Sequence, residues 1–266
     1  MKKEIIFIKL GGSVITDKQK ILTPQMDVIK SIALQIKKIK TEYPQYQIIL
    51  GNGAGSYGHY YATKYDLCNG IKDSKQIFGF CEEQNADKSL NAIIVNELLK
   101  NKLNIISLHP SSFLISENGK VKKILLDHFY NLFEMDIIPT VYGAIVIDTK
   151  LGSHIFSTED LFEILMFNFI KQRYKVKKII YLTTVDGLID KNGNLIRSVN
   201  HKENNNLEGL FYTPLGYDVT GGMRHKIETA LRHAKRGIET QIISGLTRGR
   251  LIDAISGKET IGTVIR

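Results

Sequence analysis

Short apolar runs that end in glycine-rich turns recur along this chain and alternate with segments of helical periodicity. Residues 4–10 lead into Gly11-Gly12-Ser13, and residues 46–50 lead into the segment 51–59, which contains four glycines. Continuous apolar runs are typical of strands in parallel sheets, because helices cover both faces of such a sheet. The pattern therefore predicts an α/β fold, a three-layer αβα sandwich with a mostly parallel central sheet.

The remaining predicted elements follow the same alternation. We expect helices over 25–40, 82–100, 160–173 and 224–236, and strands over 105–108, 137–141, 144–148, 178–183, 241–244 and 263–265. A hairpin is predicted over 113–124, because it contains Asn118-Gly119, a preferred pair for a tight turn. In open parallel sheets, ligands bind at the carboxyl ends of the strands. The glycine-rich turns are therefore the candidate ligand sites.

The net charge raises the question of a nucleic-acid partner, because 36 Lys+Arg stand against 27 Asp+Glu, a formal charge of +9. The lysine clusters at 37–40 and 175–178 carry no interleaved aromatic residues of the kind that stack on bases. We therefore expect no nucleic-acid partner. The lysines form either a solvated basic face or a field that attracts small phosphorylated molecules.

Neither a membrane span nor an export signal is expected. Apolar runs stay below the roughly 18–20 residues of a spanning helix, and the longest, 137–147, is interrupted by Pro139 and Gly143. The apolar part of the N-terminal segment is too short for a signal peptide. Cys68 and Cys81 lack the spacing of metal ligands, so neither a zinc site nor a disulfide scaffold is expected. We expect a cytoplasmic protein without a membrane partner.

A lysine ends the first predicted strand beside two glycines and a hydroxyl, in the order Lys9-Leu10-Gly11-Gly12-Ser13. Glycines let the backbone approach a ligand closely, and the N–H groups of such a turn can hold phosphate oxygens. Lys9 would add a positive charge at the same place. The Walker A pattern G-x-x-x-x-G-K-[ST] is missing, and an ordinary tight turn remains the alternative.

The second glycine-rich segment, 51–59, ends at His59. It lacks the acidic residue about twenty positions further on that dinucleotide-binding turns use for a ribose. We interpret it as a second phosphate cradle, in which His59 can donate a hydrogen bond to an anionic oxygen. The alternative is that His59 is an ordinary structural histidine.

A glycine pair, Gly221-Gly222, opens the predicted helix 224–236 and places Lys226 in its first turn. Helix N-termini attract anions through their free N–H groups and their dipole. Lys226 could reach a phosphoryl group that is being transferred, and an ordinary helix start is the alternative.

Two further segments lie at element boundaries. Residues 183–187, Thr-Thr-Val-Asp-Gly, end a predicted strand and form either a plain strand exit or a loop against a nucleotide base or ribose. Ser157-Thr158-Glu159-Asp160 resembles a helix N-cap with acidic residues in the first turn. These carboxylates could also orient active-site lysines.

Together these segments resemble the amino acid kinase superfamily. The order K-[LIV]-G-G-S, glycine loop, T-x-V-D-G and T-G-G-M-x-x-K agrees over essentially the whole chain. Within the superfamily the chain is most similar to isopentenyl phosphate kinases and the related fosfomycin kinases, because Gly55-Ser56-Tyr57-Gly58-His59 carries a histidine that the amino acid members lack. The resemblance implies one domain over residues 1–266, with the phosphate acceptor in about 1–150 and the nucleotide in about 151–266.

The resemblance also implies roles for single residues. The catalytic residues would be Lys9, Lys18, His59 and Lys226. ATP would be bound by Lys9, Gly11, Gly12, Ser13, Thr183, Asp186, Gly187, Gly222 and Lys226. The acceptor would be bound by Gly53, Ala54, Gly58, His59 and Ser157. Mg²⁺ would be held by phosphate oxygens and water, so no metal site built from protein side chains is expected.

Three positions depart from the pattern of these kinases. Asn52 stands for the first residue of H-G-G-G-S, Ala144 for the aspartate of H-G-D-V, and Thr158 for the glycine of S-G-D-D. The lysines and the histidine are kept. The changes therefore affect the acceptor pocket. Its expected walls are the helix 82–100 and the segment 71–80, with Phe78 and Phe80 as apolar candidates. The pocket also gains Tyr60, Tyr61 and Tyr142.

We therefore expect an ATP-dependent kinase that phosphorylates a small phosphomonoester, first of all isopentenyl phosphate, and that forms a homodimer. An alternative acceptor is a phosphonate such as fosfomycin, or another monophosphate. An alternative of another class is a non-catalytic nucleotide-binding regulator, suggested by Ala144 and Thr158.

Overall fold

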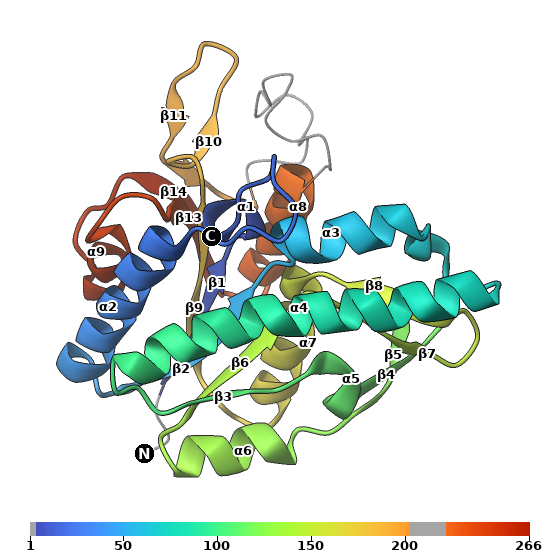
Figure 1. The fold of residues 1–266 in the computed structure, drawn as a ribbon. Helices are drawn as coiled ribbons and strands as arrows, with labels where there is room; N and C mark the ends of the chain where they lie inside the picture. Colours follow the sequence, from blue (N-terminus) through green and yellow to red (C-terminus); the bar gives the residue numbers. More distant parts are fainter. Residues whose placement is uncertain (1–3, 203–221) are drawn as a thin grey trace.

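A long, mostly parallel sheet organises the part of the chain that the computed structural model describes, residues 4–202 and 222–266 (Figure 1). Its strands there are β1 (Glu4–Leu10), β2 (Tyr46–Asn52), β3 (Ile105–Ser107), β6 (Ile138–Tyr142), β9 (Val176–Thr183), β12 (Ser198–Val199), β13 (Glu239–Ser244) and β14 (Gly262–Ile265). They lie in the order β12-β14-β13-β9-β1-β2-β6-β3, and β13 with β14 is the antiparallel pair. The predicted α/β class is confirmed.

Helices cover both faces of this sheet, as the buried strands require. The helices of one face are α2 (Met26–Glu42), α4 (Ser74–Lys100) and α9 (Arg250–Ser256), and those of the other are α6 (Asp127–Glu134), α7 (Thr158–Lys171) and α8 (Gly222–Ala234). Successive side chains of β1 point to opposite faces. Phe7 packs in the cluster with α7, whereas Ile6 and Ile8 pack in the cluster with α2 and α4. The three-layer sandwich follows from this alternation (Figure 1).

The helix α4 begins eight residues before the predicted start at 82. Asp73 caps it, since the side chain of Asp73 accepts a hydrogen bond of 2.8 Å from the backbone N–H of Gln76. Gly79 interrupts the helical pattern of the sequence, but the ring of Tyr65 occupies the space that a side chain there would need. In the described ranges no helix, α4 included, is both long and apolar enough to cross a membrane.

The chain passes from the carboxyl end of β6 into a second, smaller sheet (Figure 1). It consists of β4 (Leu114–Glu117), β5 (Lys120–Ile124), β7 (Ala144–Asp148) and β8 (Gly152–Phe156), in the order β5-β4-β7-β8. The predicted hairpin is present, and Asn118 and Gly119 both have positive φ, 49° and 72°. The strand β8 was not predicted.

Shorter elements connect these layers. They are α1 (Gly12–Ile15), α3 (Gly55–Lys64), the 3₁₀ turn η1 (Leu67–Asn69), α5 (Pro110–Phe113) and the hairpin of β10 (Leu188–Ile189) with β11 (Leu195–Ile196). The glycine-rich segment 51–59 is therefore only partly a loop, because α3 begins at Gly55. The helix α3 contacts α4 and η1 at the second sheet's end of the molecule (Figure 1).

Candidate active site

The carboxyl ends of the central strands bring the predicted segments to one edge of the sheet. Leu10 pairs with Asn52 on one side and with Leu182 on the other. The backbone N–H of Gly11 donates to the carbonyl of Leu182 at 3.0 Å, and that of Gly53 donates to the carbonyl of Leu10 at 2.9 Å. The turns after β1, β2 and β9 are therefore neighbours, where α/β sheets bind ligands.

The two glycine turns pack directly against each other. A Cβ added to Gly12 would lie 2.5 Å from the backbone nitrogen of Gly55. Thr16 joins the turns, because its hydroxyl donates to the carbonyl of Gly12 at 2.7 Å and accepts from the backbone N–H of Ser56 at 3.0 Å. Close packing explains the glycines in this chain without a ligand. The predicted phosphate contacts of Gly11, Gly12, Ser13, Gly53 and Ala54 remain predictions.

A buried ionic cluster lies beside these turns. Lys9, 5% exposed on β1, contacts Oε1 of Glu159, which is 3% exposed on the first turn of α7. The ammonium of Lys226, on the first turns of α8, lies 3.7 Å from the same oxygen. The contacts of Glu159 with Lys9 and Lys226 support the interpretation that the acidic residues after Ser157 orient lysines. We call these three residues the lysine–glutamate cluster.

The charges of the lysine–glutamate cluster shift one another's pKa values. Burial lowers the pKa of Lys9 to about 8; the charge of Glu159 opposes this shift and that of Lys226 adds to it. Burial acts to raise the pKa of Glu159, but Lys9 and Lys226 outweigh it, so the pKa of Glu159 is lowered. Glu159 is therefore ionised near neutral pH. Its single negative charge faces two ammonium groups, which leaves positive charge for an anionic ligand.

A second contact between α7 and α8 was not predicted. Ser157 and Asp160 form a capping box, in which the Ser157 hydroxyl accepts from the backbone N–H of Asp160 at 3.1 Å and Oδ2 of Asp160 accepts from the backbone N–H of Ser157 at 3.0 Å. The Ser157 hydroxyl also donates to the same Oδ2 at 2.6 Å. Nε2 of His225 lies 3.1 Å from Oδ1 of Asp160 and 3.3 Å from the Ser157 hydroxyl. The hydrogen bond to Asp160 raises the pKa of His225. His225 is one of the unspecified positions of T-G-G-M-x-x-K, so no motif signalled it.

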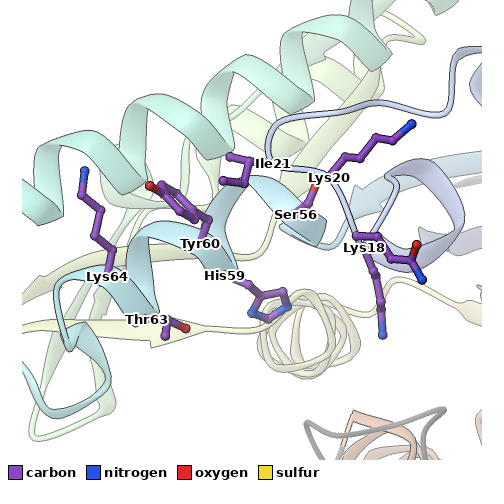
Figure 2. A pocket seen from close by; sticks show the side chains of 9 residues that line it. Lys18, Lys20, Ile21, Ser56, His59, Tyr60, Thr63 and Lys64 are labelled. Carbon is purple, nitrogen blue, oxygen red and sulfur yellow. The ribbon is translucent and has the colours of Figure 1, made fainter.

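An open cavity of about 410 Å³ lies on the outer side of α3. It is lined by Lys18, Gln19, Lys20, Ile21, Ser56, His59, Tyr60, Thr63 and Lys64. Figure 2 shows the His59 ring and the Lys18 side chain extending to the same side, from α3 and from the segment after α1. Partial burial of the ring lowers the pKa of His59, and the charges of Lys18, Lys9 and Lys226 add to this effect. The three predicted catalytic lysines therefore all lie within electrostatic range of His59.

Three of the predicted nucleotide residues, Thr183, Asp186 and Gly187, lie at and directly after the end of β9, which pairs with β1 on the side opposite β2. The Thr183 hydroxyl donates to the carbonyl of Val185 at 2.7 Å. The Asp186 carboxylate pairs with Arg250 at 2.9 Å, and Arg250 also donates to the carbonyl of Ile261 at 2.7 Å. The contact of Arg250 with Asp186 was not predicted from the sequence, because Arg250 lies in none of the glycine-rich motifs.

Other predicted positions on this side are placed only in part. A Cβ on Gly187 would lie 2.5 Å from the Thr263 hydroxyl, and the Gly222 carbonyl accepts from the Lys226 ammonium at 2.9 Å. Residues 218–221 of the motif lie outside the described residues.

Two of the three departures have structural roles here. The Thr158 hydroxyl donates to the carbonyl of Asn52 at 2.7 Å and accepts from the backbone N–H of Gly143 at 3.0 Å. The Asn52 side chain accepts from Nδ2 of Asn91, on α4, at 2.8 Å. Ala144 is buried and leaves no carboxylate at its position. Thr158 thus joins the ends of β2 and β6 to α7.

Comparison with known proteins agrees with this geometry. Residues 4–244 match the model of the amino acid kinase family. Isopentenyl phosphate kinases of Methanocaldococcus jannaschii and Methanothermobacter thermautotrophicus are each 30% identical, with 98% of this chain and 98% of the relative covered.

Solved structures lead to the same fold. A crystal structure of isopentenyl phosphate kinase superposes with a TM-score of 0.82 at 26% identity, over 98% of this chain and 100% of that chain. A product complex of the Thermoplasma acidophilum isopentenyl phosphate kinase has a TM-score of 0.76 at 22% identity, over 98% of this chain and 100% of that chain, and shows the shared fold.

Proposed function

The chain belongs to the amino acid kinase family, and we propose that it transfers the γ-phosphoryl group of ATP to isopentenyl phosphate, giving isopentenyl diphosphate and ADP. The lysine–glutamate cluster carries this proposal, because it places two ammonium groups at the ligand-binding edge of the sheet. The choice of isopentenyl phosphate as the acceptor is based on the names of the relatives that align over 98% of the chain. The same arrangement serves any small phosphomonoester that fits the pocket.

In the proposed reaction, an oxygen of the acceptor phosphate attacks the γ-phosphorus of ATP. The bond between that phosphorus and the β,γ-bridging oxygen breaks, and ADP leaves with the bond's electron pair. Such transfers need positioning and charge neutralisation more than covalent help. Lys9 and Lys226 would neutralise the charge on the transferred group, and Lys18 and His59 would hold the acceptor phosphate.

We propose that Mg²⁺ enters with ATP. Within residues 4–202 and 222–266, no group of three or more His, Cys, Asp or Glu side chains is placed to hold a metal ion. The side chains at the site are mainly lysines, which suit phosphate oxygens. Mg²⁺ commonly keeps several waters and binds through substrate phosphates, whose charge it would help to neutralise. The residues present therefore fit a metal that is carried by its nucleotide.

We also propose a homodimer, the commonest form of symmetric oligomer. Light scattering during size-exclusion chromatography tests this, because a dimer has twice the 30.1 kDa mass of the chain.

The product identifies the reaction. Phosphorus NMR of isopentenyl phosphate with Mg-ATP and the protein should show the monophosphate signal replaced by two coupled diphosphate signals, as ADP accumulates. Dimethylallyl phosphate and fosfomycin, run in parallel, separate a prenyl phosphate kinase from a phosphonate kinase. ATP consumption without any phosphorylated acceptor would contradict the proposal.

A further inference from the structure

One face of α4 carries a stripe of buried polar side chains, Glu83, Asp87 and Asn91, which we call the α4 polar stripe. Residues four apart lie on the same face of a helix. Their exposed fractions are 2%, 1% and 0%. Acidic side chains are almost never fully buried unless they are paired. The stripe therefore calls for an explanation within the fold.

The α4 polar stripe reaches the ligand-binding edge of the central sheet. Nδ2 of Asn91 donates to Oδ1 of Asn52 at 2.8 Å and to the Thr140 hydroxyl at 3.3 Å. Asn52 ends β2, directly before Gly53, and pairs there with Tyr142 at the end of β6. The stripe thus begins at the carboxyl ends of two parallel strands and continues along α4 toward Glu83.

The same stripe contacts the helix that carries the predicted acceptor residue His59. A Cβ added to Gly58 would collide with Oδ1 of Asp87. Gly58 directly precedes His59, so Asp87 lies against the inner face of α3 while the cavity lies on its outer face. From Asn91 to Glu83 the stripe extends about 12 Å along the helix axis. This length matches a short acceptor molecule beyond its phosphate.

Within the part of the chain that the structure describes, several polar atoms of this region have no hydrogen-bond partner. They are both carboxylate oxygens of Asp87, Oε2 of Glu83, Oδ1 of Asn91 and, from β6, the hydroxyl of Tyr142. Tyr142 is 1% exposed. Burial, and after it the charge of Asp87, raise the pKa of Tyr142, as expected if the two groups are near each other. Native proteins leave few buried polar atoms unpaired, and such groups signal a missing water, ion or ligand.

We propose that the α4 polar stripe, with the Tyr142 hydroxyl, is a subsite of the acceptor pocket that recognises a hydrogen-bond donor on the acceptor's tail. This inference rests on the proposed transfer to a small phosphomonoester and narrows the acceptor class, because it ranks acceptors with a polar tail above isopentenyl phosphate, the acceptor that the names of the relatives supply. The protein then takes phosphomonoesters whose tails end in a hydroxyl or an ammonium group in preference to hydrocarbon tails of the same length. A site with buried polar groups discriminates against a ligand that leaves those groups unpaired.

Three acceptors of equal length test the preference. They are butyl phosphate, 4-hydroxybutyl phosphate and 4-aminobutyl phosphate, with isopentenyl phosphate as the reference acceptor. Dissociation constants from calorimetry without ATP, and kcat/KM with Mg-ATP, are measured for each. We expect the hydroxyl or the amino acceptor to be favoured over butyl phosphate by about tenfold or more. The two donor acceptors distinguish neutral from cationic recognition.

Substitutions locate the preference on the stripe. Asp87→Leu should bring the ratio of 4-hydroxybutyl to butyl phosphate close to one, whereas Asp87→Asn, which keeps hydrogen-bonding atoms, should retain part of it. Glu97→Gln is the matched control, since Glu97 is also buried on α4 but pairs with Lys100 at 3.2 Å, far from the stripe. Its ratio should equal that of the unmodified protein.

The readouts separate failure of this inference from failure of the proposed function. Equal affinities of the unmodified protein for all three butyl compounds would overturn the subsite, whatever the turnover. A donor preference in calorimetry without ADP release would support the subsite and contradict the kinase proposal. If Asp87→Leu lowered the melting temperature and left the preference unchanged, Asp87 would have a purely structural role and the inference would be wrong.

Discussion

Glu159 and Asp87 are both almost completely buried, yet their surroundings are opposite. Glu159 contacts Lys9 and Lys226, whereas neither carboxylate oxygen of Asp87 has a hydrogen-bond partner among residues 4–202 and 222–266. Burial raises the pKa of any carboxyl group, and nearby cations lower it. Accordingly the pKa of Glu159 is lowered and that of Asp87 is raised well above its usual range.

The contrast indicates two different uses of a buried carboxyl group. The lysine–glutamate cluster is ionised and fixed before any ligand arrives, which suits the stabilisation of charge in a transition state. In the α4 polar stripe the raised pKa values of Glu83 and Asp87 favour the protonated form, and the stripe keeps hydrogen-bonding capacity that suits recognition. The following experiments test this difference, from the largest expected effect to the smallest.

Removing the charge of Glu159 should have the largest combined effect, because it reduces both stability and turnover. Glu159→Gln removes the charge that faces the buried Lys9 and the half-buried Lys226, and breaking a buried ion pair typically costs about 3–5 kcal/mol of stability. We expect a fall in kcat/KM of about 10²-fold or more, because the lysines lose their fixed positions. Chemical denaturation and steady-state kinetics measure the two losses. Glu159→Asp, which keeps the charge, should recover part of both; an unchanged stability of Glu159→Gln would contradict the paired description.

Removing the groups around the cavity should reduce turnover without reducing stability. Lys18 and His59 are exposed, and surface substitutions usually change stability by no more than about 0.5 kcal/mol. We expect Lys18→Ala and His59→Ala each to lower kcat/KM by about 10²–10³-fold, as for the loss of one positioned donor. Kinetics with melting curves separate the two effects. Full activity of both variants would reject their assignment to the acceptor phosphate.

The unpaired carboxyl groups should make stability fall with pH. Burial raises the pKa of Glu83 to about 8, and burial and Glu83 raise that of Asp87. The folded protein then binds more protons than the unfolded chain between about pH 4.5 and 8, so the free energy of unfolding decreases across this window. The slope should approach about 1.4 kcal/mol per pH unit for Glu83, and Asp87 acts in the same direction.

The double variant Glu83→Gln with Asp87→Asn isolates this dependence. Its unfolding free energy, measured by urea denaturation at several pH values, should vary less than that of the unmodified protein between pH 4.5 and 8. Parallel curves for the two proteins would show that the stripe does not titrate in this way.

His225 should have the smallest effect, because its side chain is 38% exposed and solvent screens the contact with Asp160. The raised pKa of His225 means that the contact is complete below the ordinary histidine value and is lost as pH rises through the raised one. We expect His225→Gln to increase the KM for ATP about two- to fivefold at low pH and less at high pH.

A variant of the same helix controls for nonspecific changes in α8. Glu228→Gln removes a surface ion pair with Arg224 at 2.9 Å and should leave the KM for ATP and its pH dependence unchanged. If His225→Gln changed the KM for ATP equally at all pH values, the imidazole would act through packing and not through its charge.

Local patterns predicted much of the fold and the cap of α7, although α2 is capped at Gln25 and not at the expected Thr23. The apolar run of β1, the Asn118-Gly119 turn and the Ser157 cap all depend on near neighbours in the chain, and all are present. The strand β8 was missed, because its five residues acquire strand structure by pairing with β7. The early start of α4 was also missed, although Asp73 and Gln76 carry a capping signal.

The site was only partly predictable, because it depends on contacts between residues that are distant in the chain. Glycine motifs pointed to Lys9, His59 and Lys226, and the family resemblance added Lys18. The nearness of these lysines to His59 depends on parallel strands that end at one edge. Glu83 and Asp87 lie within a predicted helix, where acidic residues normally face solvent. Their burial depends on the packing of α3 and β6 against α4. The sequence of α4 alone does not reveal this packing.

Acceptor-dependent ADP release is the most direct test of the central claim, that this protein is a phosphomonoester kinase. Initial rates are measured with Mg-ATP and isopentenyl phosphate, dimethylallyl phosphate, 4-hydroxybutyl phosphate, fosfomycin or no acceptor. We predict saturable ADP release with phosphomonoesters and only background release without them. ATP binding by calorimetry together with background rates for every acceptor would contradict the claim and favour a nucleotide-binding regulator.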